Sequence, residues 1–200
     1  MHNTGILGGS FDPFHYGHLS IVEAALALPD LDTCILMPAR VSPFKVGHKM
    51  ASEHDRLAMI RLVAEEYEEL QVSTIEMEDD EVSYTFKTLT RLQEQRPDDR
   101  LWFIMGSDSL LQMETWYKGK ELLGAFSFMV APRPGYDKQA VDACIEQFEK
   151  TYGTEIRILQ NEQYHISSTE IKAAIQEGRS IEKYVPPVVE RYIYEHGLYT

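Results

Sequence analysis

Six short apolar runs recur along the chain, separated by stretches in which apolar residues have helical spacing. Most of the runs are continuous, which is typical of strands covered on both faces of a sheet. A chain that alternates strand and helix favours a parallel sheet with helices on its two faces. We therefore expect a doubly wound α/β fold with a mostly parallel sheet. The expected strands are residues 4–8, 33–38, 71–75, 101–106, 126–131 and 155–159.

Helical spacing fills the gaps between these runs and continues alone after the last one. The Ser/Thr residues at 167–169 are N-cap candidates for a helix that Gly178 ends. Pro187 is placed for the first turn of a last helix, which Gly197 closes. We expect one domain, residues 1–200, with a small C-terminal helical portion at about 166–200. The expected helices before that portion are residues 18–28, 53–69, 84–95, 107–113, 118–123 and 137–152.

The charge balance argues against polyanionic partners. The chain has 19 Lys and Arg residues against 32 Asp and Glu residues, a net charge of −13, which repels nucleic acid and anionic membrane surfaces alike. No segment approaches the roughly 20 apolar residues of a membrane span, and no signal peptide is evident. We expect a cytoplasmic protein with neither a nucleic-acid polymer nor a membrane as partner. Cys34 and Cys144 are expected to be free thiols.

The segment GGSFDPFHYGH, residues 8–18, joins the first expected strand to the first expected helix. Ligands of open parallel sheets bind outside the carboxyl ends of the strands, so this turn is the first place to look for a site. Gly8 and Gly9 let the backbone approach a ligand, but the glycine spacing matches neither GxGxxG nor a P-loop. His15 and His18 share one face of the helix start, where free N–H groups favour an anion.

Three roles are open for the two histidines. They can cap the helix, they can form a metal pair, or their N–H groups can contact phosphate. A metal pair lacks a nearby third ligand in the sequence. A small phosphorylated ligand would need local donors to overcome the net negative charge, and a helix N-terminus supplies them. Phosphate contact is the interpretation we favour.

The motif HYGH resembles the HxGH motif of the nucleotidyltransferase superfamily, and ISSTEIK at 166–172 resembles the ISSTxIR signature of bacterial adenylyltransferases. The segments SYT at 83–85 and TWY at 115–117 extend the resemblance, over nearly the whole chain, to the bacterial nicotinate mononucleotide adenylyltransferase family. The resemblance implies a Rossmann-like fold. It also implies transfer of the AMP moiety of ATP to nicotinate mononucleotide, which forms nicotinate adenine dinucleotide and pyrophosphate in NAD biosynthesis.

The resemblance further implies roles for single residues. His15 and His18 would be catalytic, and Trp116 would stack on the pyridine ring. Lys172 replaces the family's arginine, which keeps the charge and loses the bidentate fork. The implied ATP contacts are Gly8, Gly9, Ser10, His15, His18, Gly106, Asp108, Arg133, Ser167, Ser168, Thr169 and Lys172. The implied contacts of nicotinate mononucleotide are Lys45, Ser83, Tyr84, Thr85, Trp116 and Tyr117.

Mg²⁺ is the implied cofactor, held mainly by the ATP phosphates rather than by a protein metal site. No protein nucleophile or general base is expected, because a phosphate monoester is already ionised at pH 7. We expect the acidic run at residues 76–81 to be a solvated loop. Other acceptors (nicotinamide mononucleotide or phosphopantetheine), a non-catalytic nucleotide sensor and a His-paired metal hydrolase are the alternatives. Assembly into a homodimer is left open.

Overall fold

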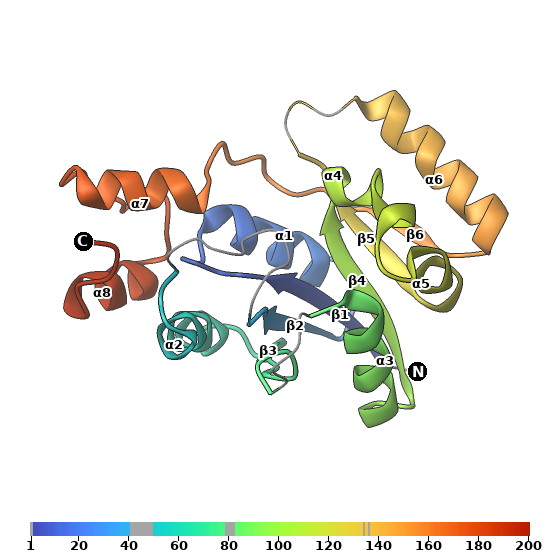
Figure 1. Ribbon diagram of the computed structural model, residues 1–200, viewed down its shortest axis with the longest axis horizontal. Coiled ribbons are helices and arrows are strands. Elements are labelled where there is room, and N and C mark those ends of the chain that lie inside the picture. Colours follow the sequence, from blue (N-terminus) through green and yellow to red (C-terminus); the bar gives the residue numbers. More distant parts are fainter. Residues whose placement is uncertain (1, 41–49, 79–82, 134, 136) are drawn as a thin grey trace.

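The computed structural model describes residues 2–40, 50–78, 83–133, 135 and 137–200. Its described strands form a six-stranded sheet in the order β3-β2-β1-β4-β5-β6, and every neighbouring pair is parallel (Figure 1). The predicted doubly wound α/β fold is confirmed. The strands are β1 (His2–Gly9), β2 (Thr33–Pro38), β3 (Leu70–Val72), β4 (Asp99–Gly106), β5 (Ser127–Ala131) and β6 (Ile156–Ile158).

Successive residues of the central strands point into two different cores. In β2, Cys34 and Leu36 belong to one buried cluster, while Ile35 and Met37 belong to the other. Because both faces of the strand are covered, every position favours an apolar residue, which explains the continuous runs of the sequence. Burial raises the pKa of the Cys34 thiol to about 12, so this cysteine is an inert part of the core.

The helices divide between the two cores. Helices α1 (Tyr16–Leu26) and α2 (Glu53–Ala64) contribute to one core, and α3 (Thr85–Gln95), α5 (Gly119–Ala125) and α6 (Lys138–Tyr152) contribute to the other. A short helix α4 (Ser107–Leu110) and a 3₁₀ turn η1 (Met113–Thr115) follow β4. None of the described helices is both long and apolar enough to cross a bilayer.

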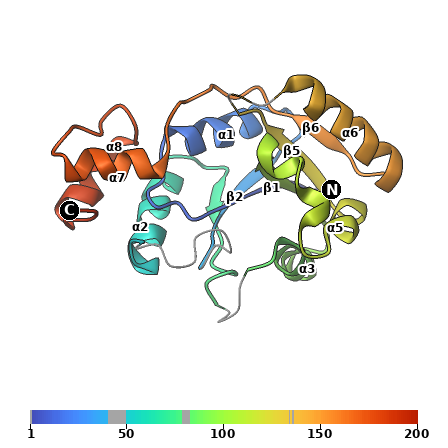
Figure 2. The same ribbon diagram turned by 45° about the horizontal axis from the view of Figure 1, so that its top comes forward.

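The last two helices lie together at one end of the molecule, and α6 lies at the other end (Figure 1). These are α7 (Ser168–Gln176) and α8 (Pro187–Glu195), which join the same core as α1 and α2. Residues 159–167 run back from β6 past α1 to reach α7, as Figure 2 also shows. This return path brings the C-terminal segment to the first part of the chain.

Helix α2 and strand β3 end three or more residues before the positions that the sequence pattern predicts. Helix α2 stops at Ala64 rather than at residue 69, because the following segment 65–69 carries four glutamates, which the negative end of a helix dipole disfavours. Strand β3 stops at Val72 rather than at residue 75. Among the described strands it pairs only with β2, at the edge of the sheet, and a turn closed by the N–H of Met77 and the carbonyl of Thr74 follows at once.

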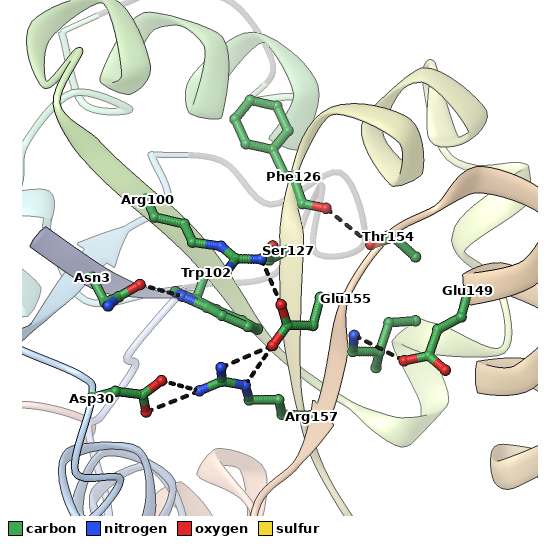
Figure 3. A network of polar contacts seen from close by, with 11 residues as sticks. Asn3, Asp30, Arg100, Trp102, Phe126, Ser127, Glu149, Thr154, Glu155 and Arg157 are labelled. Atoms are coloured by element: carbon green, nitrogen blue, oxygen red, sulfur yellow. Dashed lines mark hydrogen bonds and ion pairs between the residues drawn. The ribbon is translucent and has the colours of Figure 1, made fainter. Parts of the chain in front are cut away.

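A polar network surrounds the buried Trp102 near the amino ends of the strands (Figure 3). The guanidinium groups of Arg100 and Arg157 lie 4.6 and 4.2 Å from the indole ring centre. Arg157 donates to both oxygens of Asp30, at 2.9 and 2.7 Å, and to Glu155 at 2.9 Å. The network therefore ties β4 and β6 to the loop after α1, at the sheet edge opposite the carboxyl ends of the strands.

Replacing Arg157 with Met should destabilise the fold by about 1 kcal/mol, the size of one partly desolvated cation–π contact. Hydrogen bonds from Arg157 lower the pKa of Asp30, and hydrogen bonds from Arg157 and Arg100 outweigh burial to lower the pKa of Glu155. A lowered carboxyl pKa contributes stability above the unfolded pKa that is lost as pH falls. In chemical denaturation, the difference between wild type and R157M should therefore shrink between pH 7 and about pH 3. An equal difference at both pH values would contradict this electrostatic part.

Candidate active site

The turn between β1 and α1 is held in one conformation by its apolar residues. Phe11 and Phe14 are fully buried, and their rings lie 5.7 Å apart. Phe11 has φ 46°, in the left-handed region that non-glycine residues adopt only when their surroundings hold them there. His15 is the N-cap of α1, with an extended backbone. The turn thus delivers both histidines to the carboxyl end of β1.

The imidazole rings of His15 and His18 stack with centroids 3.8 Å apart. The backbone N–H of His15 donates to Nδ1 of His18 at 3.3 Å. Since Nδ1 accepts this bond, the ring proton of His18 lies on Nε2, which makes Nε2 a donor. The ring of Phe11 packs nearly perpendicular to the ring of His18, at 5.1 Å between centroids, so neighbouring rings and a hydrogen bond together constrain the orientation of His18.

Helix α7 begins beside this turn. The hydroxyl of Ser168 donates to the carbonyl oxygen of Pro13 at 3.3 Å, and Lys172 forms an ion pair with Asp12. Ser167 is the N-cap: its Oγ accepts from the N–H of Glu170 at 3.2 Å and donates to the Glu170 carboxylate at 2.7 Å. The HxGH and ISST motifs, about 150 positions apart in the sequence, therefore place two helix N-termini next to each other.

Arg56 is a buried residue of this region that the sequence did not single out. Its guanidinium donates to the carbonyls of Ser10 and Ala39, at 2.8 and 2.7 Å, and so links the first turn to the end of β2. Burial lowers the pKa of Arg56, and the nearby Asp12 charge opposes that shift. Within helix-spaced sequence an arginine predicts a solvated face, so no local pattern marks Arg56 as buried.

Gly106, Asp108 and Arg133 come together at the ends of β4 and β5. The Arg133 guanidinium donates to Oδ2 of Asp108 at 3.0 Å. Oδ1 of Asp108 is buried and has no hydrogen-bond partner within the described part of the chain. A Cβ on Gly106 would lie 2.3 Å from that oxygen and 2.6 Å from Nε of Arg133, so only glycine leaves room for the pair. A buried carboxylate oxygen left in this state is suited to accept from a ligand.

The SYT and TWY segments also meet in space. The rings of Tyr84 and Tyr117 lie 4.7 Å apart. Thr85 is the first residue of α3, and Ser83 precedes the N-cap. Trp116 is half-buried, with its ring edge-on to Phe103 at 6.4 Å. The prediction of one helix over 107–113 is wrong in detail, because α4 ends at Leu110 and the separate 3₁₀ turn η1 begins at Met113. Trp116 follows η1 in extended conformation.

Two further predictions concern acidic and basic residues near this segment. Glu76 is half-buried rather than solvated, and it accepts from the hydroxyl of Thr88 at 2.8 Å. Burial raises the pKa of Glu76. Glu78 is exposed, as the prediction of a solvated loop requires, while residues 79–81 and Lys45 lie outside the described residues. Across the described part of the chain, no three His, Cys, Asp or Glu side chains form a group that could hold a metal ion.

Known proteins provide an independent comparison. The model of the family described as cytidylyltransferase-like matches residues 6–174. The chain belongs to the cytidylyltransferase-like family. The family resemblance predicted from the HxGH motif is thereby confirmed.

Full-length relatives narrow the comparison within this cytidylyltransferase-like family. A probable nicotinate-nucleotide adenylyltransferase of Halalkalibacterium halodurans is 36% identical over 200 residues, covering 100% of this chain and 92% of that protein. One of Herpetosiphon aurantiacus is 35% identical over 199 residues, covering 100% and 99%. Plasmodium falciparum nicotinic acid mononucleotide adenylyltransferase, in a structure complexed with NaAD, superimposes with a TM-score of 0.80 at 20% identity. That superposition covers 100% of this chain and 98% of the other, and shows a shared fold.

Replacing Gly119 with Ala should destabilise the protein by about 1–3 kcal/mol, the usual cost of overpacking. Gly119 follows the TWY segment, and an added Cβ would lie 2.0 Å from the carbonyl oxygen of Met113, so the backbone must move. Gly124, in the same helix α5, is the matched control, because its Cβ would meet nothing within 4 Å. There, alanine should leave stability equal or raise it by up to about 1 kcal/mol. Thermal unfolding of both variants checks this; equal midpoints would contradict it.

Proposed function

We propose that this chain is a nicotinate-nucleotide adenylyltransferase. It transfers the AMP moiety of ATP to nicotinate mononucleotide and forms nicotinate adenine dinucleotide and pyrophosphate, a reaction of NAD biosynthesis. The observation that carries the proposal is the meeting of α1 and α7: their N-termini, with HxGH on one and ISST on the other, lie at the carboxyl end of β1. In a sheet of this strand order, the crevice beside β1 and β4 is the expected ligand position. The names of the full-length relatives support the choice of acceptor.

The triphosphate of ATP lies between the two helix N-termini in this proposal. Donors come from His15, His18 and the hydroxyl of Thr169, and orphan N–H groups of both helices add to them. The hydroxyl of Ser168 donates to the carbonyl of Pro13, so Ser168 takes part through the backbone at the start of α7. Ser167 contributes mainly as the cap of α7, since its hydroxyl is engaged by Glu170. These local donors allow a polyanion to bind a chain of net charge −13. The backbone at Gly8, Gly9 and Ser10 gives the ligand close access to the strand end.

Asp108 accepts hydrogen bonds from the ribose hydroxyls in this proposal, through its buried Oδ1. Arg133 holds the carboxylate from the other side, and Gly106 leaves space for both groups. The pair therefore orients the nucleoside while the triphosphate reaches the turn.

The acceptor occupies the other side of the crevice, against the Tyr84–Tyr117 pair. Trp116 stacks on the pyridine ring, because a cationic flat ring suits an indole face. The nicotinate carboxylate lies near the first N–H groups of α3, around Thr85, and near Tyr117. Ser83 and Lys45 are proposed contacts from the family resemblance.

The reaction needs alignment and charge stabilisation rather than a protein nucleophile. The 5′-phosphate oxygen of the mononucleotide attacks the α-phosphorus of ATP, and the bond from that phosphorus to the bridging oxygen breaks as pyrophosphate leaves. No proton must be removed from the attacking group. Asp12 accepts from internal donors, and Asp108 is paired with Arg133. These pairings favour an Mg²⁺ ion that is held mainly by the ATP phosphates rather than by protein carboxylates. When bound, Mg²⁺ neutralises the leaving pyrophosphate.

His18→Ala should lower kcat by about 10²- to 10³-fold, because the Nε2 donor stabilises charge that develops on the bridging oxygen. The matched control is His54→Ala, since the side chain of His54 is 86% exposed on α2, and it should leave kcat unchanged. Steady-state kinetics on both folded variants measure the effect. A loss of less than about threefold in H18A, well short of that range, would reject a direct role for His18.

Trp116→Ala should raise KM for nicotinate mononucleotide by about tenfold, the loss of one stacking contact of 1–2 kcal/mol, and KM for ATP much less. Trp116→Phe keeps an aromatic face and should recover much of the affinity. If W116A raised both KM values equally, the indole would be only a core residue packed on Phe103.

Pyrophosphate release from ATP and Mg²⁺, with each acceptor supplied in turn, tests the proposed function. We expect release with nicotinate mononucleotide and much slower release with nicotinamide mononucleotide or phosphopantetheine. Equal or faster pyrophosphate release with phosphopantetheine would contradict nicotinate mononucleotide as the acceptor and favour phosphopantetheine. Nucleotide binding without release with any of the three would favour the sensor.

A further inference from the structure

Asp12 is the acidic residue of the first turn, and both oxygens of its carboxylate accept hydrogen bonds. Only 1% of its surface is exposed. Its Oδ1 accepts from the N–H of Ala51 at 3.0 Å and from the hydroxyl of Tyr199 at 2.8 Å, and its Oδ2 accepts from Lys172. We call these donors and Asp12 the Asp12 cluster. A buried carboxylate without such donors would be strongly unfavourable, so each donor helps to fix the position of Asp12.

Tyr199 is held firmly in this cluster. Burial first, and then the charge of Asp12, raises the pKa of its hydroxyl well above the usual range, so the phenol stays protonated and donates at any working pH. The Lys172 ammonium lies 5.0 Å from the centre of its ring. The backbone of Tyr199 has φ 66°, in the left-handed region. A residue this size keeps that conformation only when its contacts compensate for the strain.

The cluster acts on the backbone that carries the two histidines. Asp12 precedes His15 by three positions, and the intervening Pro13 carbonyl is held by Ser168. The N–H of Tyr16 donates to the carbonyl of Tyr184 at 2.9 Å, from the segment before α8. Contacts from the C-terminal part of the chain therefore hold both sides of the histidine turn. Small displacements of groups that align a reaction lower its rate strongly.

We propose that Tyr199 is a positioning residue: its hydroxyl, through Asp12, holds the first turn where His15 and His18 meet the ATP phosphates. The inference rests on the proposed function and adds a requirement to it, namely that the segment after α8 is docked for phosphate alignment. Tyr199 itself contacts no substrate in this scheme.

Tyr199→Phe tests the proposal, because it removes the hydroxyl and keeps the ring and its contact with Lys172. We expect kcat to fall about tenfold and KM for ATP to rise, with KM for nicotinate mononucleotide within about twofold of wild type. Tyr194→Phe is the control, since Tyr194 on α8 is 52% exposed, and all its constants should stay unchanged. Kinetics are measured well below the unfolding midpoint of each variant. Unchanged kcat in a folded Y199F, or an equal rise in both KM values, would overturn the proposal.

A second measurement separates this proposal from the proposed function. The imidazole NMR signals of His15 and His18, recorded without substrate, should shift in Y199F and stay in place in Y194F. Unshifted signals in Y199F would overturn the link between Tyr199 and the turn, whatever the activity. A wild-type protein that transfers no adenylyl group would overturn the proposed function. The histidine signals of Y199F would still show whether Tyr199 fixes the position of the first turn.

Discussion

A single buried carboxylate lies where the two ends of this chain meet. Asp12 lies in the first turn, and the donors that satisfy it come from residues 51, 172 and 199. A charge in this position needs all-round hydrogen bonding, because the surrounding core offers no water. Donors from the segment before α2, the middle of α7 and the segment after α8 therefore meet at one point. Because Asp12 lies in the first turn and Lys172 in α7, this contact also joins the HxGH and ISST segments.

Local and global electrostatics act in opposite directions in this molecule. The net charge of −13 repels anions at long range. Helices α1 and α3 begin after the carboxyl ends of β1 and β3, and α7 begins beside the first turn, so their unpaired N–H groups act at short range on this side of the sheet. The ammonium group of Lys172 forms an ion pair with Asp12 within the fold. Neutral donors, the imidazoles and hydroxyls, therefore carry much of the recognition that the proposed function requires.

The order of elements was predictable because it depends on local patterns. Central strands such as β2 are apolar at every position, since each side chain enters one of two cores. The sequence pattern predicts the ends of α2 and β3 too far along the chain. Period alone ignores the four glutamates within residues 65–69, and it does not show that β3 is an edge strand of the described sheet. Local pattern also missed Arg56. Its burial depends on carbonyls of the first turn and of the end of β2, which it meets only in the folded state.

The sequence by itself determined the α/β class, the strand order along the chain, and the identity of the HxGH, ISST, SYT and TWY segments. These are properties of neighbouring residues: hydrophobic period, helix capping and motif spacing. Only the tertiary structure decided that Lys172 and Tyr199 share Asp12, that Tyr84 faces Tyr117, and that Gly106 makes room for Asp108 and Arg133. The donors of Asp12 are 39, 160 and 187 positions away from it. No local rule links such residues, because it is the packing of whole helices on the sheet that brings them within hydrogen-bond distance.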